Sequence, residues 1–284
     1  MYCDSHCHPF DLLDYLSKDE LESCRKGTVC AASSCNQEQF EYHEGLAKKA
    51  ASQGAAPVLL CFAVHPQLPA FLSSEETMLM ERYGEKQDRN YHIKELLLPL
   101  LESLAREKRL AAVGETGFDL FNDEYRKTEK IQDEIFAHHL EIALKYELPM
   151  VIHVRRAMHK IFAHTKKLSK VPALVFHSWP GTVGEGEALL RRGVNAFFSF
   201  GATIINNKKE SRRSCAILPA ERILFETDAP YLPLRGKTFS TWTDLPMIYK
   251  TAAELRKEAA APVNYLEELE ALCTANFYRA FSGQ

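Results

Sequence analysis

Short runs of apolar residues recur along the chain and predict buried strands. Residues 57–66 (PVLLCFAVHP), 148–154 (LPMVIHV) and 195–201 (NAFFSFG) are almost wholly apolar. Strands of a parallel sheet look like this because both of their faces are covered. Eight runs of this kind lie at residues 2–8, 27–33, 57–66, 110–117, 148–154, 171–178, 195–201 and 222–230.

Helical periodicity fills most of the intervals between these runs. Residues 37–53, for example, place Phe40, Leu46 and Ala50 on one face, which is typical of a helix packed on a sheet. Residues 67–91 interrupt the pattern, and there we expect a long loop with a helical piece around residues 75–82. Helices are predicted at residues 18–26, 37–53, 92–107, 123–147, 156–168, 180–193 and 206–218, with two more within 241–281 separated near Pro262.

Strands that alternate with helices predict a parallel sheet with right-handed crossovers. Eight such units in 284 residues are typical of a closed (β/α)8 barrel, the TIM barrel. A doubly wound open sheet is the alternative, but no Gly-x-Gly-x-x-Gly follows the first strand. No Pro/Gly/Ser-rich linker divides the chain, so we expect one barrel domain over residues 1–284.

Composition adds limits on partners and compartment. Hydrophobic residues make up 46%, charged residues 26%, and the formal net charge is -3. The chain therefore lacks a global basic field, and a polyanionic substrate has to be held by local positive groups. No apolar run is long enough to span a bilayer, and the N-terminus lacks the pattern of a signal peptide. We expect a cytoplasmic monomer whose eight cysteines, none in a Cys-x-x-Cys pair, are reduced.

Ionisable side chains stand at the C-terminal ends of the predicted strands. Side chains two apart on a strand share one face, so His6 and His8 can point at one ion. Strand ends in a barrel surround a single mouth, where active sites are built. Six of the eight predicted strands carry such residues, namely His6 and His8, His65, Glu115, His153, His177 and Asp228.

Four imidazoles and two carboxylates suffice for two divalent ions. One ion would take His6, His8, Glu115 and Asp228, and the other His153, His177 and Glu115. Glu115 is the natural bridge because a carboxylate has one oxygen for each ion. Two such ions clamp a phosphate and activate a water, whose proton Asp228 would accept. Zinc, manganese, cobalt or nickel suit this donor set better than magnesium, and the sequence does not choose among them.

Other residues near the strand ends have less specific patterns. His65 fits a phosphate contact and a hydrogen-bonded rim residue equally well, and Arg155 could bind a phosphate with its forked guanidinium. Trp179 fits either stacking on a base or packing below the rim. His138, His139, His159 and His164 lie on polar helical stretches and are expected at the surface, and His43 and His92 show no partner pattern.

At these motifs the chain resembles the TatD-type metal-dependent deoxyribonucleases of the amidohydrolase superfamily. The resemblance runs in order over nearly the whole chain. It rests most specifically on residues 114–119 (Gly-Glu-Thr-Gly-Phe-Asp) and 226–232 (Glu-Thr-Asp-Ala-Pro-Tyr-Leu). Further matches are residues 4–8 (Asp-Ser-His-Cys-His), Val64-His65-Pro66, residues 149–155 (Pro-Met-Val-Ile-His-Val-Arg), Gln132 with Phe136, residues 177–181 (His-Ser-Trp-Pro-Gly) and Asn276.

The resemblance implies hydrolysis of DNA phosphodiester bonds, often by 3'-to-5' removal of nucleotides from single strands. It implies metal ligands at His6, His8, Glu115, His153, His177 and Asp228, and substrate contacts at His65 and Arg155. The chain departs from the family at Arg156, where the family usually has Asp, and at Ser178-Trp179-Pro180. These departures line the expected mouth, so a small phosphoester, amide or lactone is the alternative substrate class. A non-catalytic metal-binding scaffold is a further alternative, but no ligand is missing.

Overall fold

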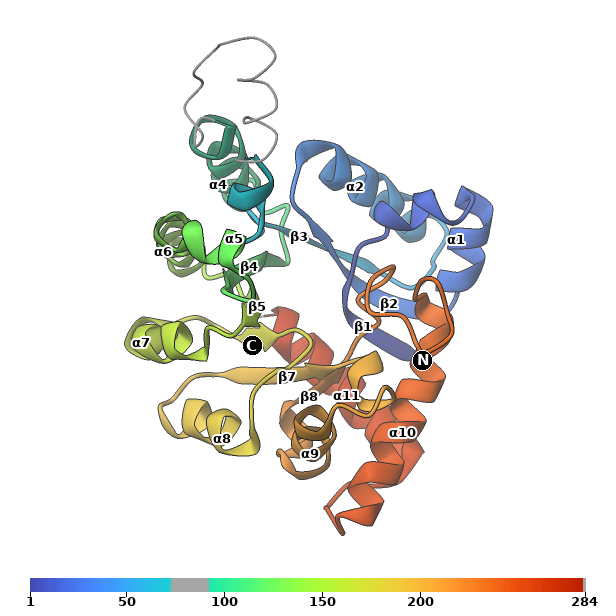
Figure 1. The fold of residues 1–284 in the computed structure, drawn as a ribbon. Helices are drawn as coiled ribbons and strands as arrows, with labels where there is room; N and C mark the ends of the chain where they lie inside the picture. Colours follow the sequence, from blue (N-terminus) through green and yellow to red (C-terminus); the bar gives the residue numbers. More distant parts are fainter. Residues whose placement is uncertain (73–91, 283–284) are drawn as a thin grey trace.

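Eight strands form one sheet in which each strand pairs in parallel with the next, in the order β1 to β8 (Figure 1). The structure is a computed structural model that describes residues 1–72 and 92–282. Sequential order confirms the barrel and excludes the doubly wound sheet, whose strand order reverses. The strands are β1 (Tyr2–Cys7), β2 (Thr28–Ser34), β3 (Val58–Phe62), β4 (Ala112–Asp119), β5 (Met150–Arg155), β6 (Leu174–Phe176), β7 (Ala196–Phe200) and β8 (Ile223–Phe225).

The first and last strands complete the barrel through the residues that follow them. The N–H of Asp228 donates to the carbonyl of His6 at 3.0 Å, and that of His8 donates to the carbonyl of Ala229 at 2.7 Å. The Asp4 carboxylate accepts from the N–H and the hydroxyl of Thr227 at 3.0 and 2.6 Å. Closure therefore places the end of β8 beside the end of β1.

Helices surround the barrel on its outside (Figure 1). Two predicted helices differ from the prediction, and residues 68–72 are helical where a loop was expected. The expected helix at 123–147 is interrupted at Thr128, which ends α5 and precedes α6, and the expected helix at 92–107 begins with a π-helical segment, His92–Leu97. The helical piece expected around residues 75–82 lies outside the described residues. The helices are α1 (Lys18–Arg25), α2 (Gln37–Ser52), α4 (Leu98–Arg106), α5 (Asp123–Lys127), α6 (Glu129–Lys145), α7 (Met158–Leu168), α8 (Val183–Arg191), α9 (Lys209–Ile217), α10 (Leu245–Glu258) and α11 (Leu266–Ser282).

A separate apolar cluster fills the barrel interior below its mouth. Inward-facing side chains such as Cys3, Val151 and Phe197 pack there with Phe277 and Phe281 of α11. In Figure 1, α11 accordingly passes behind the strands at the centre of the barrel. The interior is therefore packed and closed at one end, which leaves the C-terminal strand ends as the open end.

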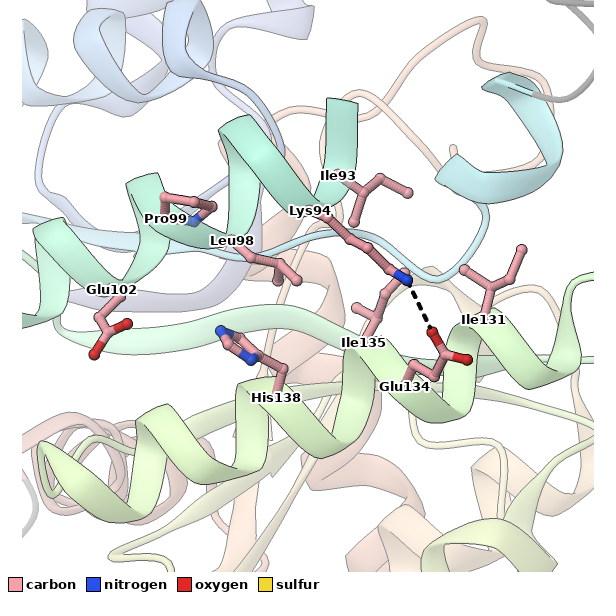
Figure 2. A pocket seen from close by; sticks show the side chains of 9 residues that line it. All are labelled: Ile93, Lys94, Leu98, Pro99, Glu102, Ile131, Glu134, Ile135 and His138. Atoms are coloured by element: carbon pink, nitrogen blue, oxygen red, sulfur yellow. Dashed lines mark ion pairs between the residues drawn. The ribbon is translucent and has the colours of Figure 1, made fainter. Parts of the chain in front are cut away.

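The outer layer of helices also leaves a groove, of about 410 Å³, between α4 and α6. Figure 2 shows Lys94 reaching across it to Glu134, with 3.5 Å between Nζ and Oε2. None of the ionisable residues at the strand ends lines this groove. Among the helices that the structure describes, none has both the length and the apolar character needed to cross a membrane.

Two helix histidines are buried, contrary to the prediction that His139 lies at the surface and His43 has no partner. His43 of α2 accepts the Phe10 N–H at 3.0 Å and contacts the Ser34 hydroxyl at 2.8 Å. His139 of α6 accepts the Val64 N–H at 3.3 Å and contacts the Thr116 hydroxyl. Each ring thus holds the segment that follows a strand, one beside His8 and one beside His65.

Burial, with a smaller contribution from the charge of His8, lowers the pKa of His43 to about 3. The unfolded chain keeps the ordinary value near 6.5, so it binds the proton first as the pH falls. We therefore expect the free energy of unfolding to drop between about pH 6.5 and 3, by up to ~1.4 kcal/mol per pH unit for this residue.

Urea unfolding of the EDTA-treated protein at several pH values measures this slope. In His43→Gln the glutamine amide can still accept from the Phe10 N–H and donate to the Ser34 hydroxyl. Because the amide does not bind a proton in this pH range, the variant's slope should be shallower. The exposed His159→Gln serves as the matched control and should keep the wild-type slope. Equal slopes for all three proteins would refute the assignment.

Candidate metal centre

The structure brings the predicted strand-end residues together at the open mouth of the barrel. Glu115 and His153 lie within β4 and β5, and His177 directly follows β6. Each of the seven predicted side chains has a polar atom within 4.0 Å of a polar atom of another of the seven. The resulting cluster, called the mouth cluster below, consists of His6, His8, His65, Glu115, His153, His177 and Asp228.

The two oxygens of Glu115 face different histidines. Oε2 lies 3.1 Å from His6 Nε2 and 3.6 Å from His8 Nε2. Oε1 lies 2.6 Å from His153 Nδ1 and 2.9 Å from His177 Nε2. Glu115 therefore stands between two donor groups, as a bridging carboxylate would.

Asp228 joins the first of these groups. Its Oδ1 lies 3.6 Å from the Nε2 atoms of both His6 and His8. Its backbone has a left-handed φ of 55°, held by the hydrogen bond from its N–H to the His6 carbonyl at 3.0 Å. The pairing of β8 with β1 thus brings this carboxylate to the two N-terminal histidines.

On the far side of three rings an oxygen atom faces the outward nitrogen, through a hydrogen bond in His6 and His153 and at a longer separation in His177. His6 Nδ1 lies 3.2 Å from the Ser33 hydroxyl, and His153 Nε2 lies 3.1 Å from Asp119 Oδ2. Among the described residues, none forms a hydrogen bond with His177 Nδ1, which lies 3.6 Å from Glu226 Oε1. An outward N–H facing an oxygen leaves the inward nitrogen with its lone pair, the arrangement found behind metal-binding histidines.

His65 has the opposite orientation. Its Nδ1 accepts the Gln67 N–H at 3.2 Å, so the proton of a neutral ring resides on Nε2. That N–H points to Glu115 Oε1 at 3.3 Å. His65 therefore presents a donor to the centre, which suits a carboxylate or a phosphate oxygen better than a metal ion.

In the absence of a metal ion, protons on the histidines have to balance the negative charge of the two carboxylates in the mouth cluster. Burial disfavours charge throughout, yet Glu115 raises the pKa of His177 well above its ordinary value, and a hydrogen bond to Asp228 raises that of His8. Burial likewise opposes ionisation of Glu115, but His177, His65 and His6 lower its pKa well below the ordinary range. The carboxylates of the cluster thus stabilise positive charge on His8 and His177.

The residues present fit divalent metal. His6 Nε2 and His8 Nε2 face each other at 3.1 Å, as do His153 Nδ1 and His177 Nε2. A cation satisfies such facing nitrogen lone pairs better than one shared proton does. Three sets of side chains each have their candidate ligand atoms within 4.8 Å of one another. The sets are His6, His8 and Asp228; His6, Glu115 and His177; and His65, Glu115 and His153.

Gly117 lets β4 and β5 approach closely beside these candidate ligands. Its φ is +140°, and a Cβ placed there would lie 2.0 Å from the carbonyl oxygen of His153. Any larger residue would therefore push apart the two strands that carry Glu115 and His153.

The remaining candidates divide between rim and interior. Arg155 is at the rim, with 43% of its side chain exposed, and its Nη1 lies 3.5 Å from Asp119 Oδ2. Trp179 is 1% exposed and packs against Phe176 and Phe198. Of the two alternatives for Trp179, the structure therefore supports packing below the rim.

The sequence did not indicate the residues that orient the candidate ligands. Asp119 and Glu226 stand inside the two most specific motifs, so their position in those motifs was an available signal. Ser33, an ordinary small residue of a buried strand, carried no signal. Its contact with His6 depends on β1 and β2 being neighbours.

Comparison with known proteins identifies relatives over the whole barrel. The model of the TatD-related DNase family matches residues 3–282. The uncharacterized metal-dependent hydrolase YcfH of Escherichia coli is 30% identical over 98% of this chain and 94% of its own. A protein named 3'-5' ssDNA/RNA exonuclease TatD, from Cronobacter sakazakii, is 32% identical over 64% of this chain and 68% of its own.

Solved structures agree with this match. The crystal structure of YjjV, a TatD homologue from Escherichia coli, superposes with a TM-score of 0.76 at 25% identity, covering 99% of this chain and 98% of that one. An uncharacterized amidohydrolase from Saccharomyces cerevisiae superposes with a TM-score of 0.75 at 15% identity, covering 99% of both chains. The second likeness shows the shared fold alone.

Proposed function

The chain belongs to the TatD-related DNase family of metal-dependent hydrolases, and on this premise we propose that it is a deoxyribonuclease. The proposed reaction is hydrolysis of phosphodiester bonds in single-stranded DNA, with nucleotides removed from the 3' end. A relative from Cronobacter sakazakii bears the name of such an exonuclease. We propose that residues 1–284 act as one catalytic domain.

One observation carries the proposal. The two oxygens of Glu115 face two separate groups of imidazoles, with His6 and His8 on one side and His153 and His177 on the other. This arrangement supports a pair of divalent ions, of magnesium, manganese or zinc: His6, His8 and Asp228 would hold one, His153 and His177 the other, and Glu115 would serve both. Paired metals are characteristic of enzymes that cleave phosphate esters.

When bound, two such ions would supply Lewis-acid polarisation of the phosphate and activation of a water near neutral pH. The chain's own residues supply the rest. Asp228 accepts the proton of the attacking water at a carboxylate oxygen. His65 directs its Nε2–H towards the centre, where it can donate to a phosphate oxygen. Arg155 can add a charged donor from the rim.

The first test follows nucleotide release from single-stranded oligonucleotides labelled at the 3' or the 5' end. Protein loaded with magnesium, manganese or zinc should release the 3' label first. Asp228→Ala removes both a ligand and the proton acceptor, so release should fall at least ~10²-fold.

Absence of release in every metal, from protein that still contains metal, would refute the nuclease proposal. A panel of small phosphoesters, amides and lactones would then identify the chemistry. Release that persists in Asp228→Ala would indicate a contaminating nuclease or a different catalytic group.

A further inference from the structure

A cluster of two arginines on one exposed aromatic ring stands beside the mouth. Phe121 follows β4, and Arg155 and Arg156 stand at the end of β5. The guanidinium carbons of Arg155 and Arg156 lie 4.1 and 4.7 Å from the centre of the Phe121 ring. Phe121 is 43% exposed. These three residues, called the rim cluster, therefore concentrate positive charge at the surface of a chain whose net charge is -3.

The charges of neighbouring arginines are compensated, whereas that of Arg156 is not. Arg155 lies 3.5 Å from Asp119 Oδ2, and Arg126 pairs with Asp123. Within residues 1–72 and 92–282, no carboxylate lies within ion-pair distance of Arg156, which instead donates to the Phe121 carbonyl at 3.1 Å. Arg156 is therefore available to an anion.

Contacts with Phe121 also hold Arg156 in place. An exposed arginine normally loses much side-chain freedom when it binds a ligand. Here the ring and the carbonyl of Phe121 hold the guanidinium. A guanidinium oriented in advance loses less entropy when it binds, and its planar fork matches a phosphate.

The two arginines of the rim cluster differ in whether contacts connect them to the mouth cluster. Arg155 contacts Asp119, whose Oδ2 lies 3.1 Å from His153 Nε2, and His153 Nδ1 lies 2.6 Å from Glu115. In the described part of the chain, no hydrogen bond or ion pair links Arg156 to Asp119 or to the mouth cluster. Arg155 is thus the arginine connected to the centre, and Arg156 stands on the same ring without that connection.

We propose that Arg156, supported by Phe121, is a second phosphate subsite that binds the phosphodiester next to the one being cleaved. This inference rests on the proposed nuclease function and deepens it. It makes a strand with at least two phosphates the preferred substrate. Arg156 would act as a specificity-determining residue and would not touch the reacting atoms.

The test compares three thymidine substrates. The dinucleotide d(TpT) has only the scissile phosphate, and d(TpTpT) adds its neighbour. The third is d(TpTpT) with an uncharged methylphosphonate in place of the neighbouring phosphate. Wild-type protein should cleave d(TpTpT) with a kcat/KM about tenfold above the other two, the usual effect of one charged hydrogen bond.

Arg156→Ala should lose this preference and cleave all three substrates with similar kcat/KM, leaving that for d(TpT) unchanged. The slope of log kcat/KM against log salt for d(TpTpT) should also become shallower by about 0.7. Arg156→Lys should restore part of the preference. Arg192→Ala is the matched control, since Arg192 stacks on Phe162 at 5.1 Å outside both clusters, and it should behave as wild type.

Two outcomes would overturn the proposal. A loss of kcat/KM shared by d(TpT) and d(TpTpT) would assign Arg156 to the scissile phosphate or to local structure. An unchanged preference in Arg156→Ala would show that the residue binds nothing. If wild-type protein cleaves none of the substrates, the proposed function fails and the subsite is tested by fluorescence anisotropy with labelled single-stranded oligonucleotide. Weaker binding by Arg156→Ala alone would then support the subsite, and equal binding would refute it.

Discussion

Replacing Glu115 by alanine should empty the metal centre, whereas replacing His65 by alanine should leave most of the metal bound. Glu115 faces imidazoles with both oxygens, at 3.1 Å on the His6 side and 2.6 Å on the His153 side. Its removal takes a ligand from both proposed ions and leaves buried histidines facing one another. His65 presents an N–H to the centre, so its loss removes no lone pair.

Mass spectrometric metal analysis after dialysis measures the difference. We expect Glu115→Ala to retain less than about a tenth of the wild-type metal, since loss of a residue that merely orients a ligand already weakens affinity by 10–100-fold. Its activity should fall by at least ~10³-fold, because both proposed ions would contribute to the proposed reaction. His65→Ala should keep more than about half of the metal.

Glu115→Gln, which keeps the size of the side chain, separates charge from packing and should also lose metal. Circular dichroism of each variant verifies that the barrel remains folded. Equal metal loss in Glu115→Ala and His65→Ala would contradict the bridging assignment.

Replacing Arg256 by methionine should cause the second large effect, a loss of stability. Arg256 of α10 is 1% exposed. It forms no ion pair with any carboxylate of the described residues. Its guanidinium instead donates to five backbone carbonyls near the C-terminal end of α9 and in the α10–α11 connection: Cys215 at 3.0 Å, Ala216 at 3.4 Å, Leu218 at 3.0 Å, Pro262 at 2.9 Å and Val263 at 2.8 Å.

Methionine fills similar space but leaves these carbonyls without donors. We expect the free energy of unfolding to fall by about 3–5 kcal/mol, the usual cost of breaking a buried charged network. Urea unfolding followed by circular dichroism measures it. Arg192→Met, on a more exposed arginine, should cost no more than about 1 kcal/mol.

Metal content should stay at the wild-type level in Arg256→Met, because α9 ends where β8 begins, opposite the mouth. A change in stability no larger than that of Arg192→Met would show that water or backbone rearrangement replaces the guanidinium.

The barrel could be predicted because its signal is local and repeated. Each strand is buried on both faces and therefore reads as an apolar run, as in residues 148–154. A polar residue at the C-terminal end of such a run lies at the barrel mouth, so the runs alone predicted that His153, His177 and Asp228 gather there. The two specific motifs around Glu115 and Asp228 pointed to the family by the same local means.

The features that the sequence did not predict depend on contacts between residues that are distant along the chain. His43 and His139 occupy polar-looking helices, yet packing buries them against segments that follow β1 and β3. The proton position on His65 depends on the direction of the Gln67 N–H, and the orientation of His6 depends on Ser33 in the neighbouring strand. Periodicity records which face of an element is apolar, but it does not record which polar atom of another element it will meet.

The sequence by itself therefore determined the class of fold, the end of the barrel that carries the candidate site, and the chemical types of the candidate ligands. Only the tertiary structure decided how those ligands divide around the two oxygens of Glu115, and that Arg156 shares the Phe121 ring with Arg155. The physical reason is that hydrogen bonds and charge contacts act over about 3–4 Å. Such distances are set when the β8–β1 and β4–β5 edges meet, and no local pattern encodes them.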